Sequence, residues 1–308
     1  MVKVVVSRVI SGVVTLLLAI TIAFFLARGT GSPAKQILGD GATAKQIAEL
    51  EAHLGLDRPL IVQYFDYLAH LFTFDLGDSL RYHSSNFELI AARMPASLML
   101  AVVAMIIAVA VGIPLGILAA RNEGGLIDRF ASGTALLGQS MPLFWLGLML
   151  VLIFSVELGW LPAGQFDSPQ SVILPAVTLS TLPMAQIARL TRSSMGEVLG
   201  EGFISAAEAR GIARWRITLI HAFRSASLPV VTIVGLQAGM LLSGAVTVEY
   251  VFGWPGLGTL ALQAVQARDF TLVQGIVVVG ATVFVVINLA VDVLYGMVDP
   301  RIREGASA

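Results

Sequence analysis

The sequence contains no cysteine, and this absence removes several kinds of chemistry from the 308-residue chain. Disulfide bonds, thiolate metal sites and cysteine nucleophiles all need that residue. We expect neither a metal site nor a catalytic site on this chain. The absence also leaves the redox compartment undetermined, since neither a disulfide nor a free thiol reports on it.

Charged residues are also scarce. Asp, Glu, Lys and Arg make up 13% of the chain, whereas a soluble domain carries roughly a quarter of such residues. The mean hydropathy is +0.85, and so much apolar surface needs the lipid bilayer as its solvent. The net charge of −1 provides no excess of positive charge for phosphates, so we expect no nucleic-acid partner.

Lysine occurs only at Lys3, Lys35 and Lys45, and none of the three follows a glycine. A P-loop needs its lysine directly after a glycine, because the loop amides hold the phosphates while the amine reaches them. The chain therefore has no nucleotide site of this kind. If it takes part in active transport, another chain must supply the energy.

Six apolar runs are each close to the ~20 residues that cross ~30 Å of hydrocarbon. They cover residues 9–27, 97–120, 130–156, 172–188, 226–248 and 272–296. The first exceeds the ~7–15 residues of a signal-peptide core, so we interpret it as a retained span. The runs do not alternate like barrel strands, and lipid offers backbone groups no partners, so all six are predicted to be helices. The fold class is an all-α membrane protein.

Basic residues in the short loops predict the orientation. With the N-terminus in the cytosol, the two short outer loops carry only Arg268. The inner segments then hold Lys3, Arg8, Arg121, Arg129, Arg189, Arg192, Arg210, Arg214, Arg216, Arg224, Arg301 and Arg303. Both termini are thus predicted to lie in the cytosol. Residues 1–27 comprise the cytosolic N-terminus and the first span, and residues 297–308 form the cytosolic tail.

The segment 28–96 is too long for a simple connector, and we expect a small extracytoplasmic subdomain there. Thr43 and Gln46 form a capping-box pattern that Gly55 closes, and residues 64–74 are typical of an interfacial or docking helix. Residues 97–296 then form a core of five helices. Its glycines, Gly112 and Gly116 among them, recur every fourth residue, which favours close helix packing, a subunit interface or a gate.

The predicted spans hold almost no charge, with Asp292 as the one ionisable residue. Ion-coupled carriers usually keep such groups in the membrane, so this pattern argues against a self-powered carrier or channel. Asp292 either snorkels to water or forms a cytosolic gate by pairing with Arg189 or Arg192. The polar residues that could line a path, or equally bond a neighbouring helix, are Gln139, Ser140, Gln237, Ser243 and Asn288.

The loop 191–225 is the most charged short connection of the chain, and it contains the sequence SAAEARG (205–211). Ser205 and Glu208 suggest a capping box for a short helix through Arg210, and Gly211 can supply a positive-φ turn. A second helix over 212–221 follows, before Leu228-Pro229 opens the next span. Small residues would let the first helix enter a groove ringed by basic ones: Ala206, Ala207, Ala209, Arg210, Arg214 and Arg216. The alternative is a basic anchor on the inner leaflet.

This loop resembles the coupling loop of ABC-importer permeases, the EAA loop, with Ala206, Ala207 and Gly211 at matching positions. The usual leading glutamate is Ser205 here, and Leu228-Pro229 comes later than in the general motif, as in the peptide and nickel branch. Further matches are LGLDRPLIVQY (54–64), DLGDSLRY (75–82), ELIAARMPAS (88–97), VEYVFGWPGLG (248–258), ARDFTLVQG (267–275) and DPRIR (299–303). The whole chain resembles the B-type permease subunit of a dipeptide or oligopeptide ABC importer.

The resemblance implies a type I importer fold in a bacterial cytoplasmic membrane, and a transport subunit that is not itself an enzyme. It implies as partners a second permease subunit, two cytosolic ATPases that bind ATP and magnesium, and an extracytoplasmic substrate-binding protein. Peptide is the expected substrate, while nickel chelates, glutathione and haem stay open. The residues that it assigns to coupling are Ser205, Ala206, Ala207, Glu208, Arg210, Gly211, Arg214 and Arg216. A membrane scaffold without a transport path is the remaining alternative.

Overall fold

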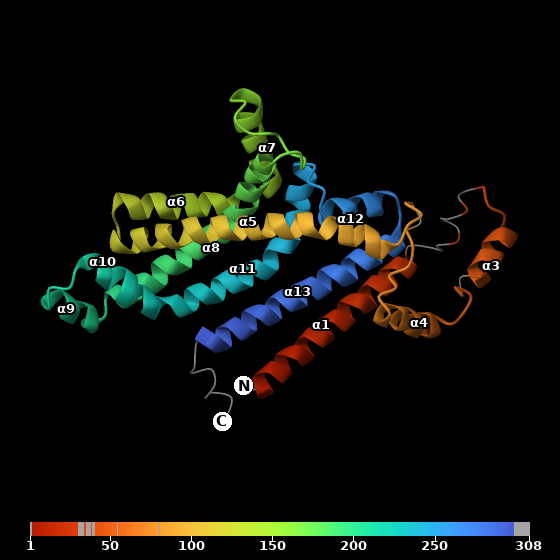
Figure 1. Ribbon diagram of the computed structural model, residues 1–308, viewed down its shortest axis with the longest axis horizontal. Helices are drawn as coiled ribbons and strands as arrows, with labels where there is room; N and C mark the ends of the chain where they lie inside the picture. The colour runs from red at the N-terminus through yellow and green to blue at the C-terminus, as the bar shows by residue number, and fades with distance from the viewer. Residues whose placement is uncertain are drawn as a thin grey trace. The chain divides into compact units, whose positions relative to one another are not determined.

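The computed structural model describes residues 2–29, 34, 38, 41–53, 55–79 and 81–298, without the side chains of 2–5, 7, 242 and 292–298. Over these ranges the chain is helical apart from loops and one isolated β-bridge, between Asp78 and Ser85 (Figure 1). The chain divides into two compact units. Helices α1, α5 and α13 contribute residues to both.

Unit 1 is formed mainly by Ser97–Trp254. In chain order it contains most of α5 (Asn86–Arg121), α6 (Leu126–Ser140), α7 (Leu143–Leu150), η1 (Val151–Glu157), η2 (Pro169–Val172), α8 (Ile173–Leu199), α9 (Gly202–Ala209), α10 (Arg214–Arg216), η3 (Ile217–Ala222) and α11 (Phe223–Val251). Helix α8 packs against both α6 and α11, and α9 and α10 lie at the far end of α8 from its start (Figure 1).

Unit 2 is formed by Ser7–Ala96 and Pro255–Val286. It contains most of α1 (Val2–Gly29), α3 (Ala44–His53), α4 (Leu60–Phe72), the start of α5, α12 (Leu257–Gln266) and most of α13 (Phe270–Val298). Its core joins the start of α5 to α12 and α13 through Ile90, Leu260, Ala264, Leu272 and Ile276. The segment 28–96 thus shares a unit with two helices from the other end of the chain.

Five helices of the described chain are long and apolar enough to cross a membrane, and a bent pair makes a sixth if it is one span. The predicted third span, 130–156, is divided into two helical segments. Helices α6 and α7 meet at an angle of 108°. The break falls at Met141, which is extended at ψ 130°, because the ring of the following Pro142 disfavours the helical conformation in the residue before it.

The predicted start of the fifth span is wrong. Leu228-Pro229 was expected to open it, yet α11 begins at Phe223 and Pro229 lies inside the helix. The helical conformation extends back to Arg214 through the π-helical turn η3. A proline inside a membrane helix is tolerated when neighbouring groups take up the backbone partners that it frees.

The glycines of α5 allow a close contact with α8. A Cβ added at Gly112 would lie 2.9 Å from the Met184 carbonyl oxygen, and one at Gly116 would lie 2.5 Å from the oxygen of Ala188. No side chain fits at such distances from a neighbouring backbone. The four-residue spacing of these glycines predicted close packing, and here the two backbones almost touch.

The segment 28–96 contains the two local features that its sequence predicted. The Thr43 N–H donates to Gln46 Oε1 at 2.9 Å and the Gln46 N–H reaches Thr43 Oγ1 at 3.4 Å, which is the expected capping box. Helix α4 begins at Leu60, four residues before the aromatic run. Its Tyr64 hydroxyl bonds that of Thr21 at 2.7 Å, so α4 docks on α1.

Aromatic packing reinforces the contact of α4 with α1. Phe24 is 1% exposed and contacts the rings of Tyr64 and Tyr67. Burial raises the pKa of Tyr67 to about 12, so its hydroxyl stays neutral at physiological pH. Other large apolar side chains of α4 are exposed, namely Leu60, Ile61, Phe65 and Phe72.

Replacing Gly116 with alanine tests the α5–α8 contact. The new Cβ would lie 2.6 Å from Thr191 Cβ as well as against the Ala188 backbone, so the helices must separate. We expect the free energy of unfolding to fall by about 1–3 kcal/mol, measured as a lower Tm of the purified protein in detergent. Gly133→Ala in α6 is the matched control, because nothing lies within 4 Å of its Cβ. Equal losses in both variants would contradict this packing.

Candidate functional site

The loop between α8 and α11 is held in one conformation by its own backbone. Helix α9 ends at a Schellman motif: the Gly211 N–H donates to the Glu208 carbonyl at 2.9 Å and the Ile212 N–H to that of Ala207 at 3.2 Å. Gly211 has φ +74°, in the left-handed region that glycine adopts most readily. The predicted helix end and glycine turn are confirmed.

The start of α9 differs from the prediction. The helix begins at Gly202, after an extended Glu201, and no side chain caps it. Ser205 and Glu208 therefore lie inside the helix, so the predicted capping box is wrong. The pattern misled because a serine three residues before a glutamate also occurs within helices. The predicted second helix, 212–221, starts at Arg214 and continues into α11 without interruption.

One face of the loop is buried in an apolar cluster. Ile204 and Ile217 are 5% and 3% exposed, and Met195 at the end of α8 is fully buried between them and their neighbours. The rest of the cluster comes from α5, the loop and the start of α11: Ile113, Ile117, Ala120, Val198, Leu199, Ala207, Ile212, Ala222, Phe223 and Ala226. Burying a large apolar side chain contributes about 1.5–3 kcal/mol, so the cluster fixes the loop to three long helices.

The other face of the loop is exposed, and we call it the α9–α10 surface. It consists of Ser205, Ala206, Glu208, Ala209, Arg210, Arg214, Trp215 and Arg216. The short side chains of Ala206 and Ala209 do not protrude from the middle of this surface. Its three arginines give it a net positive charge. Trp215 is 55% exposed, with the guanidinium of Arg216 over its ring at 5.4 Å. An exposed tryptophan beside small residues is typical of a surface that another protein covers.

Seven of the eight residues expected to act in coupling are exposed on the loop. The exception is Ala207, which is half-buried and faces the apolar cluster. Trp215 was not among the expected residues, although a single tryptophan between two arginines in a basic loop was a recognisable signal. The α9–α10 surface is therefore slightly larger than the sequence predicted.

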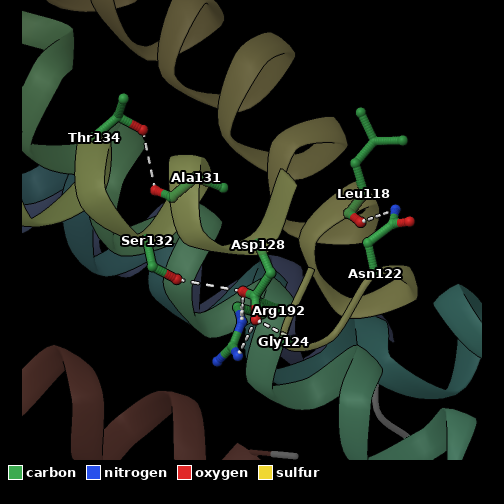
Figure 2. Close-up of polar contacts among 8 residues, drawn as sticks. All are labelled: Leu118, Asn122, Gly124, Asp128, Ala131, Ser132, Thr134 and Arg192. Carbon is green, nitrogen blue, oxygen red and sulfur yellow. Dashed lines mark hydrogen bonds and ion pairs between the residues drawn. The ribbon is translucent and has the colours of Figure 1, made fainter. Parts of the chain in front are cut away.

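An ion pair between a buried carboxylate and a partly exposed arginine joins α6 to α8 near the same end of unit 1. Both Nε and Nη2 of Arg192 donate to the Asp128 carboxylate, with Nη2 at 2.8 Å (Figure 2). The carboxylate also accepts the Gly124 N–H at 2.9 Å and the Ser132 hydroxyl at 3.3 Å. The Asp128 side chain is 7% exposed and that of Arg192 is 37% exposed. Two parallel bonds make this a directional contact.

The ion pair bears on the gate that was considered for Asp292. Arg192, one of its two expected partners, is held by Asp128. The other, Arg189, is exposed beside a cavity between α5, α6 and α8. Asp292 itself lies in α13, and its side chain is outside the described residues. No local pattern indicates Asp128 as a partner, because it is 64 residues from Arg192.

The expected path residues lie in different surroundings. Gln237 is 4% exposed, and its amide donates to Gln186 Oε1 at 2.7 Å, which joins α11 to α8. Gln139 lines the cavity beside Arg189. Ser140 donates to a carbonyl of its own helix. Ser243 is exposed on α11, and Asn288 is half-buried on α13.

Two buried carboxylates lie at helix ends that the sequence analysis placed just outside the spans. Glu249, in α11, is fully buried and accepts the Ser97 hydroxyl of α5 at 2.5 Å. In unit 2, Asp269 is 1% exposed and accepts the hydroxyls of Ser79 and Thr271 at 2.5 and 2.9 Å. Each acid lies within a motif that carried the resemblance, and each ties two distant segments together.

No cluster of three or more potential metal ligands occurs among the described residues. The arrangement that remains is a bundle of long apolar helices with one anchored, exposed, basic loop. This is the geometry of a helical membrane protein with an exposed basic surface at one end of its bundle. It defines a class of protein rather than a reaction.

Comparison with known proteins agrees with this class. The family described as binding-protein-dependent transport system inner membrane component matches residues 112–304, and its N-terminal companion matches residues 1–101. The chain belongs to this family. It is accordingly a multi-pass membrane protein of the permease type, as the resemblance of its coupling loop implied.

Individual relatives narrow the branch of the family. The chain is 43% identical to the dipeptide transport system permease protein DppB of Escherichia coli, over 89% of this chain and 90% of that one. It is 39% identical to the di/tripeptide transport system permease protein DppB of Pseudomonas aeruginosa, with the same coverage of each chain. It is 41% identical to the glutathione transport system permease protein GsiC of Salmonella typhimurium, over 98% of this chain and 99% of that one.

The fold also matches a solved structure. A chain of the MetNI methionine ABC transporter in an inward-facing conformation superposes with a TM-score of 0.59 and 19% identity, covering 68% of this chain and 96% of that chain. The expected type I importer permease fold is confirmed by this match.

A double-mutant cycle tests the Asp128–Arg192 pair. Asp128→Asn and Arg192→Gln should each lower the Tm, and the double variant should lose less than the sum, with a coupling energy of about 1–3 kcal/mol. Lys45 and Glu49 form the control pair. Lys45 Nζ lies 3.9 Å from Glu49 Oε1, and the two side chains are 86% and 66% exposed. A coupling energy below about 0.5 kcal/mol is therefore expected for this pair. Additive losses at Asp128 and Arg192 would remove the pair as a link between α6 and α8.

Proposed function

We propose that this chain is the membrane-spanning subunit that forms half of the translocation path of an ATP-driven importer of short peptides. The observation that carries the proposal is the α9–α10 surface, which is exposed and basic on one face and buried in the apolar cluster on the other. Family membership and the three peptide-system relatives support it.

The energy for transport is proposed to come from partner chains. None of the lysines follows a glycine, so a P-loop has no place here. Two cytosolic ATPase subunits would bind ATP and magnesium and receive the α9–α10 surface. A second permease subunit would complete the path, and an extracytoplasmic binding protein would deliver the substrate. This chain is then a transport subunit and not an enzyme in its own right.

The orientation follows from the same assignment. If ATPases contact the α9–α10 surface, this loop lies in the cytosol, and an even number of crossings places both termini there too. The bent pair of α6 and α7 then has to count as one span. The distribution of arginine, dense on the proposed inner side and sparse in the short outer loops, supports this orientation.

In the proposed mechanism, the apolar cluster connects the loop rigidly to the long helices. Closure of the ATPases around ATP would push on Ala206 and Trp215 at the exposed face. Because Ile204 and Ile217 on the buried face pack against Met195 of α8, the push would move α8 and α11 together with the loop. Packed interiors respond to such a force by shifting between discrete arrangements rather than by deforming.

The substrate class rests on the relatives. Their systems are named for dipeptides, di- and tripeptides, and glutathione, which is itself a tripeptide with a thiol. Nickel chelates and haem are not favoured by any of these relatives. Competition of labelled dialanine uptake by unlabelled dipeptides, tripeptides or glutathione in the reconstituted complex would rank these substrates. Uptake that none of them reduces would contradict a peptide importer.

Gly211→Val tests coupling directly. A β-branched residue at φ +74° is strained, so the Schellman motif should open and tilt α9 away from its cluster. We expect peptide uptake to fall at least about tenfold, equal to ~1.4 kcal/mol, while the protein still inserts and the ATPases still bind ATP. The measurement is peptide-stimulated ATP hydrolysis together with uptake in proteoliposomes.

Two variants control for this experiment. Gly211→Asn should retain coupling, since asparagine tolerates the left-handed region and nothing lies within 4 Å of the added Cβ. Gly202→Ala changes the same loop at a position with open space and should have no effect. Normal uptake and normal peptide-stimulated ATP hydrolysis in Gly211→Val would show that this loop does not couple the ATPases to transport.

A further inference from the structure

A cavity of about 210 Å³ lies within unit 1, between α5, α6 and α8. Its walls are mostly apolar, with Ala119 from α5 and Ala131, Ala135 and Leu136 from α6. The proposed coupling mechanism does not use this cavity, although Gln139, one of the expected path residues, lines it. It begins near the turn that joins α5 to α6, which the proposed orientation puts at the cytosolic side.

Hydrogen-bond donors and positive charge gather in this apolar space. Gln139 presents a buried Nε2 that has no hydrogen-bond partner within the described part of the chain. Arg189 and Arg192 both line the cavity, and Asp128 neutralises only one of them. Figure 2 shows that Arg192 is turned toward Asp128 and Ser132 on the facing side of α6. A ligand here must therefore bring an anionic oxygen that accepts hydrogen bonds.

The outer surface of α6 beside the cavity is apolar and uncovered within unit 1. Phe130 is 69% exposed, Leu136 is 61% exposed and Leu137 is 56% exposed. In a membrane protein such a surface meets acyl chains. The same ligand can therefore place a charged head among the arginines and a hydrocarbon tail along α6.

We infer that the cavity binds the phosphate headgroup of an anionic phospholipid from the inner leaflet. The phosphate takes the Gln139 amide and the Arg189 guanidinium as donors, and an acyl chain lies along Leu136 and Phe130. Basic pockets between membrane helices on the cytoplasmic side are suited to such headgroups. A peptide carboxylate shares the anionic chemistry but brings no long hydrocarbon chain, so it leaves the exposed face of α6 uncovered. The leaflet assignment rests on the proposed orientation, whereas binding itself does not.

Native mass spectrometry of the full chain in detergent tests the inference, with palmitoyl-oleoyl phosphatidylglycerol and phosphatidylcholine as probes. The chain should retain phosphatidylglycerol preferentially. Arg189→Gln should weaken that retention about fivefold, since one arginine near an anionic lipid contributes a factor of this size. Arg129→Gln is the matched control, because this arginine lies on the same end of α6 and does not line the cavity.

Ala135→Leu supplies a second variant, because it fills the cavity without changing charge. It should abolish preferential retention, and an unchanged Tm without lipid would confirm that it folds. Equal retention of both lipids, or equal losses in Arg189→Gln and Arg129→Gln, would overturn the inference. Displacement of phosphatidylglycerol by millimolar dialanine would overturn it in favour of a peptide site. Loss of lipid binding with normal peptide uptake would leave the proposed importer function intact.

Discussion

The burial of Met195, Ile204 and Ile217 in one cluster is the contact on which the functional reading of this molecule depends. Without it, α9 would not hold its conformation, since eight residues do not form a stable helix alone. With it, the loop is packed rigidly against the end of α5, the end of α8 and the start of α11. A force on Ala206 or Trp215 then reaches long helices directly.

The same principle of tying distant segments recurs at the other helix ends. Ser97 and Glu249 join α5 to α11 in unit 1, and Ser79 and Asp269 join the 75–82 segment to the start of α13 in unit 2. A buried carboxylate is costly unless it is hydrogen-bonded, so each of these contacts selects one arrangement of its helices. The glycines of α5 add a third restraint by bringing its backbone against that of α8.

Much of this could be predicted from the sequence because lipid imposes simple rules. Long apolar runs must be helices, and a glycine after a short amphipathic segment marks a helix end, as Gly211 does. The break between α6 and α7 was harder to predict from the sequence. Pro114, Pro183 and Pro229 lie inside long helices, whereas Pro142 follows the end of one. Whether a proline kinks or breaks a helix depends on tertiary contacts. The pairing of Asp128 with Arg192 depends on the packing of α6 against α8, which no local pattern encodes.

The absence of cysteine provides the most direct test of the central claim, that partner ATPases bind the α9–α10 surface from the cytosol. A single Ala206→Cys substitution in this cysteine-free chain gives one reactive thiol on that surface, and Ala222→Cys gives a buried control in the same loop. In inside-out vesicles holding the complete complex, the Ala206→Cys thiol should crosslink to an ATPase subunit, whereas the Ala222→Cys thiol should not. Labelling of the Ala206→Cys thiol by an impermeant maleimide from the outer face of sealed cells, with no ATPase crosslink, would contradict the account.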